Sequence, residues 1–170
     1  IERALVSLFA GAIWRRDGDA FEEYAENKGG KRPRASGRID LWFSFQNEDF
    51  KCEAKQCWVR VADLLKARSR VKIVMKRARQ DAASLTHGGM RRLAMVFGAV
   101  LVPKGLRTEL EEHMKSAVKL ATDKGIKSDA VAWVFPDLEN PLQSSKGYLF
   151  PGIIIWLREI PGRPSRKSVP

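Results

Sequence analysis

Residues 37–56 read GRIDLWFSFQNEDFKCEAKQ, and apolar and polar side chains alternate along two parts of this stretch. Alternation with a period of two is typical of a half-buried β-strand. The polar link between the two parts, residues 46–49, is short, so the two strands are predicted to form a β-hairpin. Matching the two apolar faces predicts a register of three pairs, which are Leu41 with Ala54, Phe43 with Cys52 and Phe45 with Phe50.

The polar face of this predicted hairpin carries two acids and a lysine. The predicted register places Asp40 directly opposite Lys55, with Glu53 on the diagonal. Cβ atoms at such positions lie ~5 Å and ~7 Å apart, so the two carboxylates can converge on one hard cation such as Mg²⁺. The alternative interpretation is a cross-strand ion pair on the surface, which is worth only ~0–1 kcal/mol.

The rest of the chain divides into further helical and strand-like segments. Helices are predicted over residues 1–15, 60–86 and 106–122, where apolar residues recur at helical spacing. Strands are predicted over residues 21–26, 93–102, 129–135 and 153–156, and the first of these could also be a short helix. This order predicts a mixed α/β fold with a sheet flanked by helices, in one domain over residues 1–160. Residues 161–170 are predicted to form a disordered basic tail.

The composition argues against several classes of protein. The longest apolar run, residues 93–102, is well short of the ~20 residues of a membrane-spanning helix, so no membrane partner is expected. Only two cysteines are present, Cys52 and Cys57, which is too few for a disulfide scaffold and fits a reducing compartment such as the cytoplasm. With only two histidines in 170 residues, a triad or metal site built on histidine is not expected.

The charge balance favours a polyanionic partner. The chain has 31 Lys and Arg against 20 Asp and Glu, a formal net charge of +11. Basic side chains also gather in the Gly-containing segment that leads into the strand bearing Asp40, where they can contact a phosphate backbone. The residues predicted to bind nucleic acid in this way are Lys28, Lys31, Arg32, Arg34 and Arg38. A solvated basic surface is the alternative interpretation.

Residues 37–41 (GRIDL), a short link and residues 52–56 (CEAKQ) resemble the motif of the PD-(D/E)xK nuclease superfamily. Members of that superfamily share the restriction-endonuclease-like fold, whose αβββαβ core is a helix, a three-stranded meander carrying the acids, a helix and another strand. The order of the predicted elements looks like that core over residues 1–102. One departure is Ile39, which stands where many members have proline.

The resemblance implies a set of catalytic residues and a metal cofactor. Asp40 and Glu53 would ligate Mg²⁺, for which Mn²⁺ would substitute, and the backbone carbonyl of Ala54 would be a further ligand. Lys55 would be the catalytic lysine. The resemblance also implies an acid from the first helix, for which Glu2 is the candidate. Glu23 is its rival on the first predicted strand.

Together these patterns predict a metal-dependent nuclease that hydrolyses phosphodiester bonds of DNA as an endonuclease. RNA stays open as a substrate, and a homodimer or a larger assembly stays open as the functional form. Two other functions also remain open. One is a non-catalytic nucleic-acid-binding module of the same fold, and the other is an interaction domain of a larger assembly.

Overall fold

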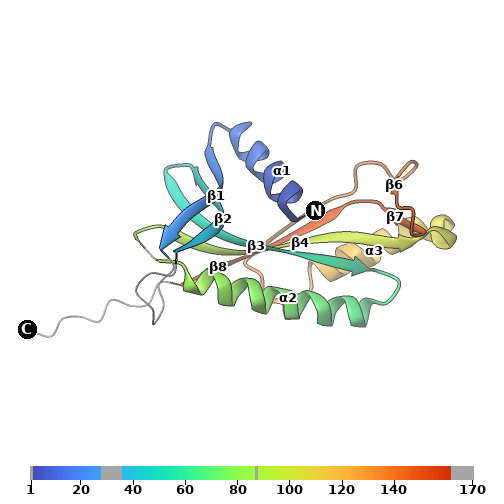
Figure 1. The fold of residues 1–170 in the computed structure, drawn as a ribbon. Helices are drawn as coiled ribbons and strands as arrows, with labels where there is room; N and C mark the ends of the chain where they lie inside the picture. Colours follow the sequence, from blue (N-terminus) through green and yellow to red (C-terminus); the bar gives the residue numbers. More distant parts are fainter. Residues whose placement is uncertain (1, 28–35, 87, 162–170) are drawn as a thin grey trace, which may run out of the picture.

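The computed structural model describes residues 2–27, 36–86 and 88–161, which fold into an α/β structure (Figure 1). The elements follow in the order α1 (Glu2–Trp14), β1 (Asp19–Asn27), β2 (Ser36–Phe45), β3 (Glu48–Arg60), α2 (Leu64–Ser84), β4 (Arg91–Pro103), the 3₁₀ turn η1 (Lys104–Glu109), α3 (Leu110–Ala121), the 3₁₀ turn η2 (Lys124–Ile126), β5 (Ala130–Val134), β6 (Leu142–Gln143), β7 (Tyr148–Phe150) and β8 (Ile153–Ile160). None of the helices in these described residues has the length and apolar character to cross a membrane.

The strands of the described residues form one open, mixed sheet of eight strands. β1, β2 and β3 make an antiparallel meander, and α2 then crosses over so that β4 lies parallel to β3. β8 pairs antiparallel with the other side of β4, and β5 pairs with β8. The predicted mixed α/β class is confirmed at this level. Residues 21–26 belong to a strand rather than a helix, and the predicted tail lies outside the described residues except for Pro161.

The hairpin of β2 and β3 forms as predicted, but with a different register. The observed pairs are Leu41 with Cys52, Phe43 with Phe50 and Phe45 with Glu48, two residues away from the predicted ones. In the predicted register, residues 46–49 form a link of four residues between the two strands. The chain instead turns at Gln46 and Asn47 alone, which both adopt left-handed φ angles, of 52° and 62°, as the tight two-residue hairpin turn requires.

This shift changes which residues face each other across the hairpin. An even shift keeps every side chain on its predicted face, so Asp40, Glu53 and Lys55 still share one face. Continuing the observed register places Asp40 level with Glu53. The prediction that Asp40 lies directly opposite Lys55 is therefore wrong.

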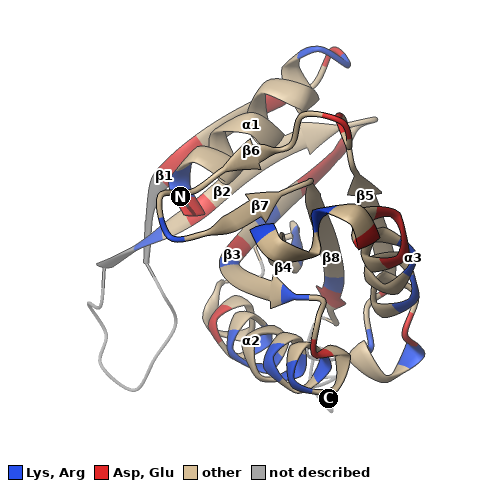
Figure 2. Ribbon diagram, turned by 90° about the vertical axis from the view of Figure 1, so that its right-hand side faces the viewer, with Lys and Arg blue, Asp and Glu red and all other residues tan. Residues whose placement is uncertain are grey.

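The helices cover the two faces of the sheet unequally, with α1 on one face and α2 and α3 on the other (Figures 1 and 2). The core under α1 contains Leu5, Val6, Ala10 and Ile13 of the helix and Leu41, Phe43, Cys52, Ala54, Met95 and Phe97 of the strands. The core under α2 and α3 contains Val71, Met75, Ala78, Met114 and Leu120 of the helices and Cys57, Val59, Val96, Val100 and Trp156 of the strands. The two cysteines are thus free and on opposite faces of the sheet.

Helix α2 is fixed at both ends. At its start the Asp63 carboxylate accepts a hydrogen bond of 3.1 Å from the backbone N–H of Lys66, which satisfies one of the amides left free at a helix N-terminus. At its end the buried Arg92 guanidinium donates to the carbonyls of Ala83 and Leu85, and also to that of Pro161. The helix whose side chains face β3 is therefore held at both ends.

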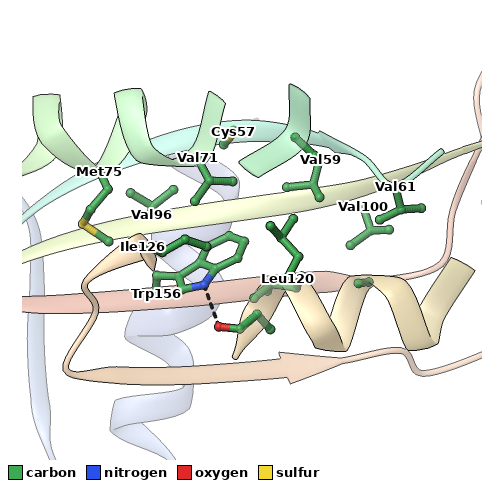
Figure 3. Close-up of a cluster of buried hydrophobic side chains, with 14 of the residues drawn as sticks. Cys57, Val59, Val61, Val71, Met75, Val96, Val100, Leu120, Ile126 and Trp156 are labelled. Atoms are coloured by element: carbon green, nitrogen blue, oxygen red, sulfur yellow. Dashed lines mark hydrogen bonds between the residues drawn. The ribbon is translucent and has the colours of Figure 1, made fainter. Parts of the chain in front are cut away.

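Trp156 of β8 occupies the centre of the larger core (Figure 3). Its side chain is fully buried, and its indole N–H donates a hydrogen bond of 3.1 Å to the carbonyl of Ala121 at the end of α3. Gly98 of β4 lies against the same indole. A Cβ atom at Gly98 would come within 2.5 Å of Cζ3 of Trp156 and 2.9 Å of Cγ2 of Val59.

Gly98→Ala is therefore expected to lower the free energy of unfolding by about 1–3 kcal/mol, because the close-packed indole must move to admit a methyl group. Urea denaturation followed by circular dichroism measures this change. The matched control is Gly105→Ala, since a Cβ atom at Gly105 has no neighbour within 4 Å. Equal unfolding midpoints for the two variants would contradict the packing at Gly98.

Candidate functional site

The site forms where β2 and β3 separate. The backbones of the two strands pair from Phe45 and Glu48 to Leu41 and Cys52. Beyond that point, side-chain carboxylates accept hydrogen bonds from the backbone amides of β3. The Asp40 carboxylate accepts a hydrogen bond of 2.8 Å from the backbone N–H of Ala54, and the Glu2 carboxylate accepts one of 2.8 Å from that of Gln56. Carboxylates from β2 and α1 thus bind the amides of Ala54 and Gln56, two successive amides on the same edge of β3.

Lys55 lies at the centre of a cluster of carboxylates. Its Nζ atom is 3.1 Å from Oδ2 of Asp81, 3.9 Å from Oδ2 of Asp40 and 4.0 Å from Oε2 of Glu53. These groups come from three elements, since Asp40 lies on β2, Glu53 and Lys55 on β3, and Asp81 on α2. The structure therefore brings together the three residues of the predicted motif and adds a third acid.

The cluster keeps the Lys55 side chain charged. Partial burial of the ammonium group works against its charge. The hydrogen bond to Asp81 and the negative charges of Asp40, Asp81 and Glu53 together outweigh this effect, so the pKa of Lys55 lies above its ordinary value. Lys55 is consequently an ammonium ion at neutral pH and acts as a cation or a hydrogen-bond donor, not as a base.

Glu53 is the most buried member of the cluster, with 3% of its surface exposed. Lys51, two residues earlier on the same face of β3, is also buried and donates to the carbonyl and the hydroxyl of Thr86 just after α2. Burial of charged groups is costly unless other charges or hydrogen bonds compensate. Both buried charged residues beside Lys55 have such polar partners, Lys51 at Thr86 and Glu53 at Lys55.

Of the two rival acids, Glu2 binds the backbone of β3, whereas Glu23 binds arginines. Glu23 pairs with Arg3 at 2.9 Å and accepts a hydrogen bond of 2.6 Å from Arg38. Glu2 and Asp40 line the same cavity of about 590 Å³, together with Glu23 and the two arginines. Glu2 is thus the acid from the first helix that lies next to the cluster.

The predicted nucleic-acid contacts are only partly within the described residues. Arg38 is exposed and lines the same cavity as Asp40. Lys28, Lys31, Arg32 and Arg34 lie outside the described residues.

Asp81 is the residue of this cluster that the sequence patterns did not single out. A signal was available, because Asp81 is the only acid among the 21 residues of α2, which also carry seven Lys and Arg. A lone acid in so basic a helix is a candidate for a specific partner. Its position beside Lys55 depends on how α2 lies across the sheet.

The acids of this cluster offer the type of ligand atom that a hard divalent cation takes. Oxygen ligands are the kind that Mg²⁺ prefers, and Asp40 and Glu53 each place a carboxylate oxygen within 4.0 Å of one common point, the Nζ atom of Lys55. Within the described residues, no three Asp, Glu, His or Cys side chains form a ready-made metal-binding group. Mg²⁺ is commonly held by only one or two protein carboxylates together with waters, so two acids are enough for it.

Comparisons of the chain with protein-family models, with curated proteins and with solved structures found no match.

Proposed function

We propose that this protein is a metal-dependent nuclease that cleaves DNA, and that it is a member of the PD-(D/E)xK superfamily. The observation that carries the proposal is the meeting of Asp40, Glu53 and Lys55 on one face of neighbouring strands. Both carboxylates lie within 4.0 Å of the Lys55 ammonium. Two acids and a lysine in this arrangement are suited to metal-assisted hydrolysis of a phosphodiester.

The order of the elements also supports membership of the superfamily. Over Glu2–Pro103 the chain forms a helix, a three-stranded meander, a helix and a strand parallel to the third strand of the meander. This is the αβββαβ order that the resemblance implies. The acids sit on the second and third strands of the meander, and the acid from the first helix, Glu2, reaches the third strand.

In the proposed reaction the two acids hold the metal and the lysine holds the phosphate. Asp40, Glu53 and the backbone carbonyl of Ala54 would bind Mg²⁺, which when bound polarises the scissile phosphate and makes a water more acidic. The Lys55 ammonium would donate to a phosphate oxygen as negative charge develops there. Asp81 is a positioning residue, because it holds the ammonium in place through its contact of 3.1 Å.

The charge of the surrounding surface fits a polyanionic substrate. The chain carries an excess of 11 positive charges, and lysine and arginine recur along the exposed side of α2 (Figure 2). Because α2 also supplies Asp81, this basic helix borders the proposed catalytic cluster directly. A DNA backbone lying along α2 would bring its phosphates to Lys55.

The proposal is tested by incubating the protein with supercoiled plasmid and linear DNA in Mg²⁺, in Mn²⁺ and in EDTA. Cleavage is expected with either metal and not in EDTA. Asp40→Asn is expected to lower the rate about 100-fold or more, because it removes one negative ligand of the metal. The matched control is Asp49→Asn, an exposed acid of the same hairpin, which should cleave like the parent protein.

The opposite result favours the second function that the sequence leaves open. If the protein binds DNA in a salt-dependent way but cuts it with neither metal, the nuclease proposal is wrong, and the non-catalytic binding module accounts better for the basic surface.

A further inference from the structure

A second cavity lies at the far end of β3, beyond the catalytic cluster. It has a volume of about 670 Å³ and is enclosed by the last residues of β3, the first turns of α2 and the start of β7. The aromatic and charged residues that line it are Trp58, Arg60, Asp63, Lys66, Arg70 and Tyr148. It therefore combines two aromatic rings with three cations and one acid.

Of the two aromatic residues, Trp58 lies at the open edge of β3, where its ring is 6.0 Å from that of Phe150 of β7. Beyond Cys52, β3 pairs only with β4 among the described residues, so the side of β3 that bears Trp58 has no neighbouring strand there. Trp58 lines this cavity and also an apolar cavity on the α1 face, which places its ring at the edge between the two faces. The Arg60 guanidinium lies over the Tyr148 ring at 5.7 Å.

The basic side chains give the cavity a net positive charge. Lys66 is paired with Asp63 at 2.9 Å, so these two largely offset each other. Arg60 and Arg70 are both exposed and remain as an excess of two positive charges. Arg70 and Lys66 also share one side of α2 with Arg77 and Asp81, because these residues recur at helical spacing. That side of α2 leads from the cavity to the catalytic cluster.

The separation of the two sites matches a short run of nucleotides. Trp58 is three residues beyond Lys55, a distance of about 10 Å along a strand. On α2, Ile73 at the cavity is eight residues from Asp81, about 12 Å along the helix. A strand of duplex DNA rises about 3.4 Å per nucleotide and an unstacked strand extends further, so these distances correspond to at most about three nucleotides.

We infer that this cavity is a subsite for an unpaired base and its phosphates, in a single-stranded segment of DNA next to the cleaved bond. The inference rests on the proposed nuclease function and deepens it by naming the form of the substrate. Aromatic rings interleaved with cations are how proteins hold single strands, because each base can stack on a ring while its phosphate meets a cation. The volume suits one such ligand, whereas the bases of an intact duplex are stacked inside the helix and cannot enter.

The test compares the affinities of the full chain for two DNAs in EDTA, where no cleavage occurs. One is a blunt duplex, and the other is the same duplex with a single-stranded extension of about eight nucleotides, made with either end extended. Fluorescence anisotropy gives the Kd values. The parent protein is expected to prefer an extended duplex. Trp58→Ala should weaken binding of that DNA about tenfold and leave the blunt duplex unchanged.

Three further variants make the test decisive. Trp133→Ala removes an exposed tryptophan of β5 and should change neither affinity. Trp58→Phe keeps a ring for stacking and should restore most of the preference. If Trp58→Ala fails to fold, Arg60→Gln replaces it, because an exposed side chain can be exchanged without loss of the fold. The same selective loss of affinity is expected, since Arg60 is one of the cations that line the cavity.

The inference is overturned if the parent protein binds blunt and extended duplexes equally, or if neither Trp58→Ala nor Arg60→Gln reduces the preference. Failure of the nuclease proposal gives a different pattern. A protein that prefers the extended duplex in EDTA, yet never cuts in Mg²⁺ or Mn²⁺, retains the subsite and lacks the reaction.

Discussion

Lys55→Ala is expected to lower the rate of DNA cleavage in Mg²⁺ by about 10²–10³-fold, the usual cost of removing one group that stabilises charge in the transition state. The structure gives this lysine no replacement within the cluster, whose other members are the carboxylates of Asp40, Glu53 and Asp81. The rate is measured from the conversion of supercoiled plasmid to nicked and linear forms.

A binding measurement and a control variant separate a loss of catalysis from a loss of structure. Without the ammonium group, the three carboxylates repel one another more strongly and attract cations more strongly. Calorimetry should therefore show Mg²⁺ binding to Lys55→Ala that is at least as tight as to the parent protein. The control is Lys119→Ala, an exposed lysine of α3, which should keep the parent rate. A Lys55→Ala protein that cuts at the parent rate would remove Lys55 from the mechanism.

Trp156→Ala is expected to have the largest effect on stability, a loss of about 3–5 kcal/mol in the free energy of unfolding. The indole is fully buried between β4, α2 and α3, so its removal leaves a cavity in the larger core (Figure 3). The exchange also leaves the carbonyl of Ala121 without its donor. Since a domain of this size is stable by only about 5–15 kcal/mol, the variant should be close to unfolding at 37 °C.

Urea denaturation measures the loss, and two further variants divide it. Trp156→Phe keeps most of the apolar volume and removes the N–H donor, so it should recover a large part of the stability. Trp133→Ala, at a tryptophan that is 42% exposed, should cost much less. If Trp156→Ala and Trp133→Ala unfold at the same urea concentration, Trp156 does not have the central place in the core that the structure gives it.

The hairpin illustrates how far alternation in a sequence can be taken. A pattern with a period of two assigns each side chain to a face, and it did so correctly for Asp40, Glu53 and Lys55. It cannot distinguish registers that differ by two residues, because both keep the same faces. The tight turn at Gln46 and Asn47 determines which of the two registers forms. Gln46 gives no sequence signal for a left-handed φ angle, as a glycine at that position would.

Other features of the site depend on contacts between distant segments. The amphipathic pattern predicts α2 but not which of its polar residues lies over Lys55, so Asp81 was not identified. The choice between Glu2 and Glu23 depends on how α1 lies against the meander, which only the folded chain shows. Strands β6 and β7 have two and three residues, too few for any periodic signal, and yet β7 contributes Tyr148 to the second cavity.

The separation of β2 from β3 also bears on self-association. A strand edge with free amides is a template on which another chain can add a strand and begin to aggregate. Here the carboxylates of Asp40 and Glu2 already occupy the amides of Ala54 and Gln56, so they block that edge as well as line the site. Replacing both acids by alanine would open the edge, whereas replacing Lys55 leaves it closed. An inactive protein for trapping DNA is therefore better made at Lys55, where solubility should be preserved.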